Sequence, residues 1–261
     1  MTTRIITAVA ALAIVAVVLF VLPPVWAEFV IALLMLAGAW EWSAFLGIDR
    51  RRVRIAYTAL LAVCLAAVHG AAPGQADFVM LVACVWWFVA FLWALRFPTQ
   101  IPAAIRWLCG ILVIVPLFIA LVTLLRLGVE YLIFTLLIVW VADGGAFFAG
   151  KKFGRVKLAP AISPGKTWEG VVGGMVLVAL LALAAALLTD ASIAVLLPFC
   201  LAVGAVSVVG DLTVSMFKRT AGVKDSGTLF PGHGGVRDRI DSVAAAAPLC
   251  ALGLGWLGIV A

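Results

Sequence analysis

Nine long stretches that are almost free of charged residues limit what this 261-residue chain can fold into. A helix needs about 20 apolar residues to cross the hydrocarbon core of a bilayer. Hydrophobic residues make up 66% of the chain and charged residues 11%, and a soluble fold of such residues would expose large apolar patches to water. We therefore predict an all-α, polytopic integral membrane protein with about nine transmembrane helices. The expected spans are 5–22, 25–46, 55–70, 77–95, 107–125, 131–149, 168–189, 192–214 and 243–260.

Basic residues fall almost entirely on one side of this predicted topology. With the N-terminus inside, 17 of the 18 Lys and Arg residues lie on the inner side, and Arg126 alone lies outside. Because Lys and Arg are enriched in cytosolic loops, we expect the loops 150–167 and 215–242 in the cytosol, and the protein in a bacterial inner membrane. This distribution accounts for the net charge of +6, so no nucleic-acid partner is expected. The sequence leaves a homodimer open.

The two halves of the chain differ in their chemistry. Residues 1–130 are expected to form scaffold helices, whereas 131–261 form a catalytic region, because every lysine lies between positions 151 and 224. The first span has features of a signal peptide, but its apolar run is long and further spans follow, so we treat it as a retained helix. The five cysteines stand singly in apolar stretches, which indicates packing rather than disulfides or metal ligation. His69, near an outer span end, is assigned no role.

Asp143 lies inside the sixth predicted span. A carboxylate at such depth costs roughly 2.5–3.5 kcal/mol on insertion scales, so it needs a partner or a wet cavity. Gly144 and Gly145 follow it and permit close approach of the backbone to a helix or a ligand. Asp143 is therefore either a functional group or a carboxylate that joins neighbouring helices.

Residues 163–170 form a short basic segment before the seventh predicted span. Gly165-Lys166-Thr167 resembles the end of a P-loop, but that motif needs a glycine where Pro160 stands, and no strand is expected before it. Free N–H groups at a helix start, together with Lys166, suit an anion. The alternative is a membrane-anchoring charge, with Ser163 or Thr167 capping the helix.

Polar residues are concentrated between Gly210 and Asp241. On a helix, Asp211, Ser215 and Lys218 share one face through i, i+4 and i+7 spacing. Asp238 and Asp241 share another face at i and i+3, after a glycine-rich turn. Carboxylates without Cys or His spacing favour a hard cation such as Mg²⁺, and nearby Lys and Arg suit phosphates. The segment thus predicts phosphoryl-type transfer, which is mostly positioning and charge neutralisation.

These motifs resemble the phosphatidate cytidylyltransferase family, also called CDP-diacylglycerol synthase. Its signature is Ser, two positions, Lys-Arg, four positions, Lys-Asp, and then Pro-x-His-Gly-Gly, a hydrophobic and a variable position, and Asp-Arg-hydrophobic-Asp. The chain matches this spacing throughout, with Ser215, Lys218-Arg219, Lys224-Asp225, Pro231–Gly235 and Asp238–Asp241. The resemblance is close over 140–248. Val214 departs from it, because many members carry Glu there, which puts any role of that side chain in doubt.

The resemblance implies that CTP and phosphatidate in the bilayer react to give CDP-diacylglycerol and pyrophosphate with Mg²⁺, for which Mn²⁺ could substitute. It implies Asp211 and Asp238 as metal ligands, while Asp225 and Asp241 either join them or orient basic groups. The implied catalytic residues are Asp211, Lys218, Arg219, Lys224, Asp225, Asp238, Arg239 and Asp241. The implied substrate-binding residues are Asp143, Ser163, Lys166, Thr167, Ser215, His233, Gly234 and Gly235.

Three other functions fit the sequence less well. A CTP-dependent lipid kinase needs the same ingredients and differs only in its products. A transporter would more often show two related halves with broken helices, and the sequence shows no such repeat. A CDP-alcohol phosphotransferase would need an Arg in the run after Asp143, where residues 144–148 offer none.

Overall fold

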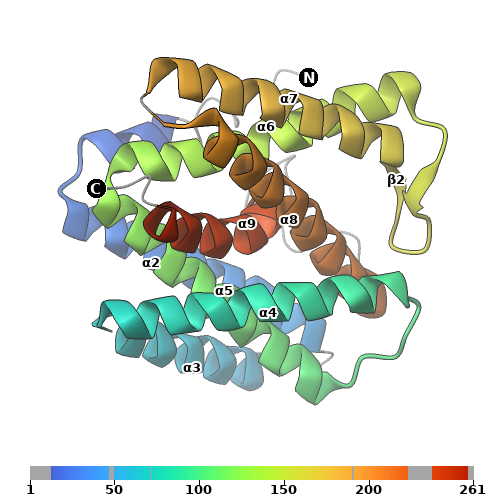
Figure 1. Ribbon diagram of the computed structural model, residues 1–261. Helices are drawn as coiled ribbons and strands as arrows, with labels where there is room; N and C mark the ends of the chain where they lie inside the picture. The colour runs from blue at the N-terminus through green and yellow to red at the C-terminus, as the bar shows by residue number, and fades with distance from the viewer. Residues whose placement is uncertain (1–12, 47–49, 71, 190, 223–236, 258–261) are drawn as a thin grey trace.

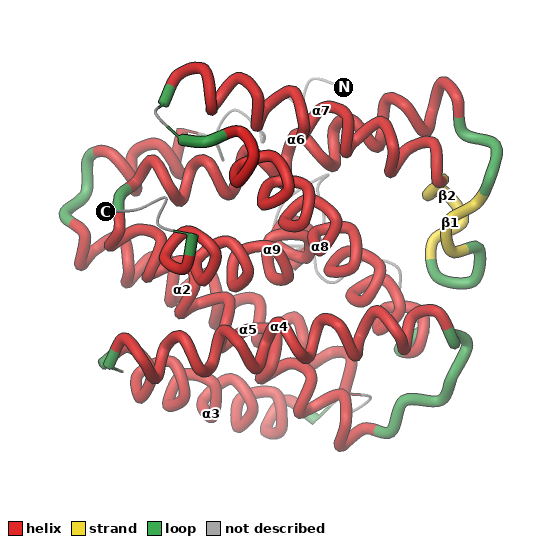
Figure 2. The backbone as a smooth tube through the Cα atoms, viewed as in Figure 1, coloured by secondary structure: helices red, strands yellow, loops and turns green. Residues whose placement is uncertain are grey.

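The computed structural model describes residues 13–46, 50–70, 72–189, 191–222 and 237–257, and helices make up nearly all of this part (Figures 1 and 2). The helices are α2 (Pro24–Ser43), the 3-10 turn η1 (Ala44–Leu46), α3 (Arg51–His69), α4 (Pro73–Leu95), α5 (Ala103–Leu127), α6 (Val129–Phe153), α7 (Trp168–Leu188), α8 (Ile193–Thr220) and α9 (Arg237–Trp256). Two short strands, β1 (Lys157–Ala159) and β2 (Ser163–Thr167), lie between α6 and α7.

The prediction of a polytopic all-α membrane protein is confirmed. In the described part, the seven helices α2 to α8 are long and apolar enough to cross a membrane, and α9 contains a shorter apolar stretch, Ile240–Trp256. Each of the last eight predicted spans corresponds to one of these helices. The first predicted span lies partly outside the described residues, and its residues 13–20 are helical.

The helix α9 lies in the interior of the bundle. It packs against α2, α4, α5, α6 and α8, and Figure 1 shows it beside α8 near the centre of the molecule. The run from Ala244 to Ala247 is at most 1% exposed. These small side chains let several helices approach one axis closely. The apolar stretch of α9 is therefore a core element shared by both halves of the chain.

The helices α6 and α7 form a tightly packed antiparallel pair along one side of the molecule (Figure 1). Gly174 shows how close they are, because a Cβ atom there would lie 2.5 Å from the carbonyl oxygen of Ala142. Glycine is required at this position because any side chain would push the two helices apart. The pair carries the β-hairpin at one end and so fixes where that hairpin lies.

The segment 150–167 differs from the featureless loop that the sequence predicts. Helix α6 continues to Phe153, beyond the end of its apolar run, and β1 and β2 then form an antiparallel hairpin in which Lys157 pairs with Thr167. The expectation that no strand precedes Gly165-Lys166-Thr167 was wrong, but these three residues lie within β2 rather than in a glycine-rich loop after a strand. The P-loop remains excluded. Likewise, the predicted loop 215–242 is shorter, because α8 continues to Thr220 and α9 begins at Arg237.

At the end of the bundle opposite the hairpin, one buried carboxylate joins three helices. Glu28 of α2 accepts hydrogen bonds from Nε and a terminal nitrogen of Arg126 in α5, at 2.7 and 2.9 Å. His69 of α3 lies 2.7 Å from the same carboxylate. A bidentate pair of this kind combines charge with fixed geometry. His69, which the sequence analysis left without a role, thus contributes to the contact between α2, α3 and α5.

Candidate active site

Polar residues from α6, β2, α8 and α9 converge at the end of the bundle that carries the hairpin. The closest contact is an ion pair in which Nζ of Lys166 lies 2.5 Å from Oδ2 of Asp211. Lys166 belongs to β2 and Asp211 to α8, so the contact joins the hairpin to the long helix across the site. Both side chains are about one quarter exposed, at 25% and 28%. The pair is therefore partly sheltered yet still open to a ligand.

The last turns of α8 present the row of polar residues that the sequence predicts. The hydroxyl group of Ser215 donates a hydrogen bond to Oδ1 of Asp211 at 3.3 Å, which confirms that the two residues share a face. One turn later, Nζ of Lys218 lies 3.9 Å from Oδ2 of Asp241 in α9. Lys218 is 9% exposed, so its charge is held between the helices rather than in solvent.

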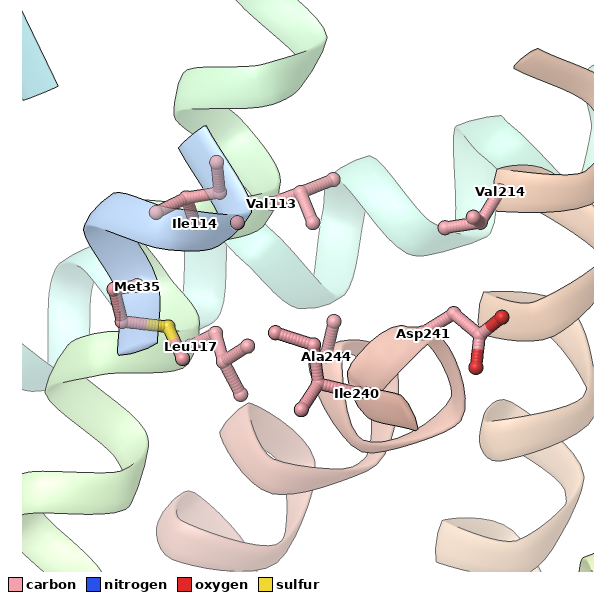
Figure 3. A pocket seen from close by; sticks show the side chains of 9 residues that line it. Met35, Val113, Ile114, Leu117, Val214, Ile240, Asp241 and Ala244 are labelled. Atoms are coloured by element: carbon pink, nitrogen blue, oxygen red, sulfur yellow. The ribbon is translucent and has the colours of Figure 1, made fainter. Parts of the chain in front are cut away.

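Asp241 reaches the site because α8 and α9 touch through a glycine. A Cβ atom at Gly210 would lie 2.5 Å from the backbone carbonyl oxygen of Asp241, so only glycine allows this approach. Figure 3 shows Asp241 at the edge of a small cavity whose other labelled residues are apolar. The cavity holds about 10 Å³, roughly the space for one water molecule. The described lining residues are Met35, Gly38, Val113, Ile114, Leu117, Val214, Ile240, Asp241 and Ala244.

Asp143 joins this cluster from α6, as the sequence analysis proposed for a carboxylate within a span. Its carboxyl group interacts electrostatically with Asp211 and Lys166 and forms a hydrogen bond with Ser242. Ser242 was not predicted as a site residue, and its backbone N–H also donates to Oδ1 of Asp241 at 2.9 Å. The signal was present, because Ser242 directly follows Asp241 at the start of a span. Its short hydroxyl side chain, however, fits a helix interior equally well.

Contacts around the hairpin hold Lys166 in position. The hydroxyl group of Thr167 accepts a hydrogen bond from the N–H of Gly170 at 3.2 Å and caps α7. The carboxylate of Glu169 accepts hydrogen bonds from the backbone N–H groups of Arg155 and Val156. Nε of Arg219, at the end of α8, donates to the carbonyl oxygen of Ile162 at 3.0 Å. Thr167 and Arg219 thus have structural contacts next to the site.

The structure describes only some of the remaining predicted site residues. Ser163 is partly buried at the start of β2, paired with Ala159. Lys224, Asp225, His233, Gly234 and Gly235 lie outside the described residues. Asp238 and Arg239 lie in the first turn of α9, one turn before Asp241 and Ser242, and their side chains lie outside the described part.

Among the described residues of the cluster, carboxylates outnumber ammonium groups. The carboxylates of Asp143 and Asp241 each interact with that of Asp211, and the three share two ammonium groups, those of Lys166 and Lys218. An excess of carboxylate oxygen is the environment that Mg²⁺ prefers. Within the described ranges, no three Asp, Glu, His or Cys side chains are close enough together to hold a metal ion. A metal at Asp211 and Asp238 therefore stays a prediction.

Known proteins that resemble this chain agree on one family. A model of the cytidylyltransferase family matches residues 2–256. A phosphatidate cytidylyltransferase of Pseudomonas aeruginosa is 42% identical, with 97% of each chain covered. This chain belongs to the cytidylyltransferase family. A second relative of that name, from Haemophilus influenzae, is 34% identical over 94% of this chain, and one from Staphylococcus saprophyticus is 44% identical over 47% of it.

We predict that Lys166→Ala lowers activity by about ten- to a hundredfold, because a charge-assisted hydrogen bond contributes roughly 1.5–3 kcal/mol. The measurement is kcat/KM for CTP with purified protein in detergent. Arg52→Ala, which removes an exposed charge at the start of α3, is the matched control and should leave kcat/KM near the parent value. An unchanged kcat/KM in Lys166→Ala would remove Lys166 from the site.

Proposed function

We propose that this protein transfers the CMP unit of CTP to phosphatidate, which yields CDP-diacylglycerol and pyrophosphate. The observation that carries the proposal is the match to the cytidylyltransferase family across nearly the whole chain, together with relatives of full length that are named phosphatidate cytidylyltransferase. The cluster around Lys166 and Asp211 supports it, since these residues belong to the segments that resemble the family.

The reaction needs no nucleophile from the protein. A phosphate oxygen of phosphatidate attacks the α-phosphorus of CTP, a new P–O bond forms, and the bond between the α-phosphorus and the bridging oxygen to the β-phosphate breaks. Pyrophosphate leaves with that electron pair. Lys166 and Lys218 supply positive charge to the phosphates, while Asp211 and Asp241 hold the two ammonium groups in place. Catalysis then comes from positioning and charge neutralisation.

The position of the cluster suits two substrates from different phases. It lies within α6 and α8, towards the ends of these helices that are nearest the hairpin. A lipid can approach from the bilayer and a nucleotide from water. The excess of Lys and Arg on this side favours the cytosol, where CTP is available. We place the site on the cytosolic face of a bacterial inner membrane.

A divalent cation belongs to this proposal. The donor set is oxygen only, which suits Mg²⁺, with Mn²⁺ as a substitute. Asp211 would hold the ion together with Asp238, which precedes Asp241 by one turn of α9. When bound, such an ion would offset negative charge on the nucleotide phosphates.

Product analysis tests the reaction and separates it from its nearest rival. Purified protein incubated with CTP, phosphatidate and Mg²⁺ should release one pyrophosphate for each CDP-diacylglycerol formed, measured by coupled phosphate detection and by mass spectrometry of the lipid. Release of CDP with a phosphorylated lipid would instead identify a CTP-dependent lipid kinase.

Asparagine variants test the metal assignment, because Asn keeps the shape of Asp and removes its charge. We expect Asp211→Asn and Asp238→Asn to abolish nearly all turnover, with partial recovery at high Mg²⁺ or with Mn²⁺. The measurement is specific activity of monodisperse protein across a Mg²⁺ titration. Asp77→Asn, in α4, is the control for an equal charge change. Near-normal activity of both site variants at low Mg²⁺ would exclude these two residues as ligands.

Accessibility of single cysteines tests the orientation. In a cysteine-free background, Lys157→Cys in the hairpin should resist a membrane-impermeant thiol reagent in intact cells and react after permeabilisation. Ala72→Cys, in the connection between α3 and α4 on the opposite side, should react in intact cells. Labelling of Lys157→Cys in intact cells would reverse the topology.

A further inference from the structure

A wide, open hollow lies beside the hairpin, at the end of α6. Its volume is about 380 Å³, within the range of roughly 300–1,000 Å³ that small-molecule sites occupy. Lys152, Phe153, Gly154, Arg155 and Glu169 line it. It lies at the junction of α6, the connection to β1 and the first turn of α7.

This hollow is separate from the carboxylate cluster. Lys152 follows Asp143 by nine residues, which is two and a half turns of helix. The two side chains therefore leave α6 on opposite faces. Asp143 contributes to the cluster with Asp211 and Lys166, and none of these three residues lines the hollow.

The walls of the hollow carry two basic side chains, Lys152 and Arg155, and Lys152 has no anionic partner among the described residues. In the described part of the chain, Lys151 and Lys152 form no ion pair, and Nζ of Lys152 lies 5.3 Å from the ring centroid of Phe153. Glu169 is the one carboxylate on the lining, and it already accepts hydrogen bonds from the backbone N–H groups of Arg155 and Val156. Glu169 also attracts the side chain of Arg155. An anion would therefore find two cationic groups here, Lys152 without a competing carboxylate and Arg155 shared with Glu169.

Exposed apolar side chains lie on the segments that form the hollow. Phe147, Phe148, Phe153, Val156 and Trp168 are between 54% and 71% exposed. In a polytopic membrane protein, a bilayer covers such side chains, and Trp favours the interface. The basic residues of the same turns then lie at the level of the lipid headgroups. The hollow is thus open both to headgroups and to the acyl chains below them.

We propose that this hollow binds the headgroup phosphate of an anionic phospholipid, such as phosphatidylglycerol, at a site distinct from the one that binds the reacting phosphatidate. Lys152 and Arg155 contact the phosphate, and the acyl chains lie along the exposed phenylalanines of α6. Basic pockets at the cytosolic ends of transmembrane helices recognise anionic headgroups through this combination of charge and adjacent apolar surface. The site is additional to the nucleotidyl transfer proposed above and does not depend on it.

Direct lipid binding tests this site without any use of CTP. Purified protein in neutral detergent is titrated with phosphatidylglycerol or phosphatidylcholine, and retained lipid is counted by native mass spectrometry. The double variant Lys152→Gln/Arg155→Gln should bind phosphatidylglycerol about 30-fold more weakly, since each basic residue near the membrane surface contributes on the order of 1 kcal/mol. The control Arg51→Gln/Arg52→Gln removes the same charge from exposed positions of α3 and should bind like the parent.

Three outcomes would overturn the proposal. Equal weakening in the control would show that net charge alone attracts the lipid. Unchanged binding in Lys152→Gln/Arg155→Gln would show that the hollow is not the site. Displacement of phosphatidylglycerol by millimolar inorganic phosphate would show that a free anion, not a lipid, is the ligand. If the parent and both double variants retain phosphatidylcholine to the same extent, the loss of binding is specific to the anionic headgroup.

Discussion

The ion pair between Lys166 and Asp211 is the contact on which the arrangement of the site depends. It joins the strand β2, between α6 and α7, to a residue of α8 more than 40 positions later in the chain. Near a bilayer, unpaired charges are costly, so each carboxylate of the cluster is stabilised by a neighbour. Asp211 has Lys166 and Ser215, Asp241 has Lys218 and Ser242, and Asp143 has Ser242. This requirement draws the four elements α6, β2, α8 and α9 together.

The first half of the chain, residues 1–130, packs directly against the helices that carry the site. The ring of Trp42 in α2 lies 5.2 Å from that of Phe217 in α8, directly beside Lys218. Residues of α2 and α5 also form most of the cavity next to Asp241 (Figure 3). A substitution in residues 1–130 can therefore alter the site by changing how α8 and α9 pack, without contacting a substrate.

The sequence predicted those features that depend on local pattern. Apolar runs located the helices, and the spacing of Asp211 and Ser215 placed them on one face of α8. Features that depend on contacts between distant segments were not predictable in the same way. The hairpin is too short for an alternating pattern, and Pro160 and Pro164 obscure its strands. The pairing of Glu28 with His69 and Arg126 joins positions far apart in the chain. The approach of Gly210 to Asp241 depends on the absence of a side chain, which single-sequence reading cannot distinguish from any other glycine.

The alanine run of α9, residues 244–247, limits how far Asp241 can move. A helix with such small side chains is narrow, and its neighbours lie almost against its backbone. Close-packed interiors yield little to added volume, so even one extra methylene group on Ala245 or Ala247 would press on several partners at once. Asp241 lies one turn before this run, so the close packing of the alanines also restricts the backbone position of Asp241. Small apolar residues without any chemistry of their own thereby limit how far a charged group of the site can move.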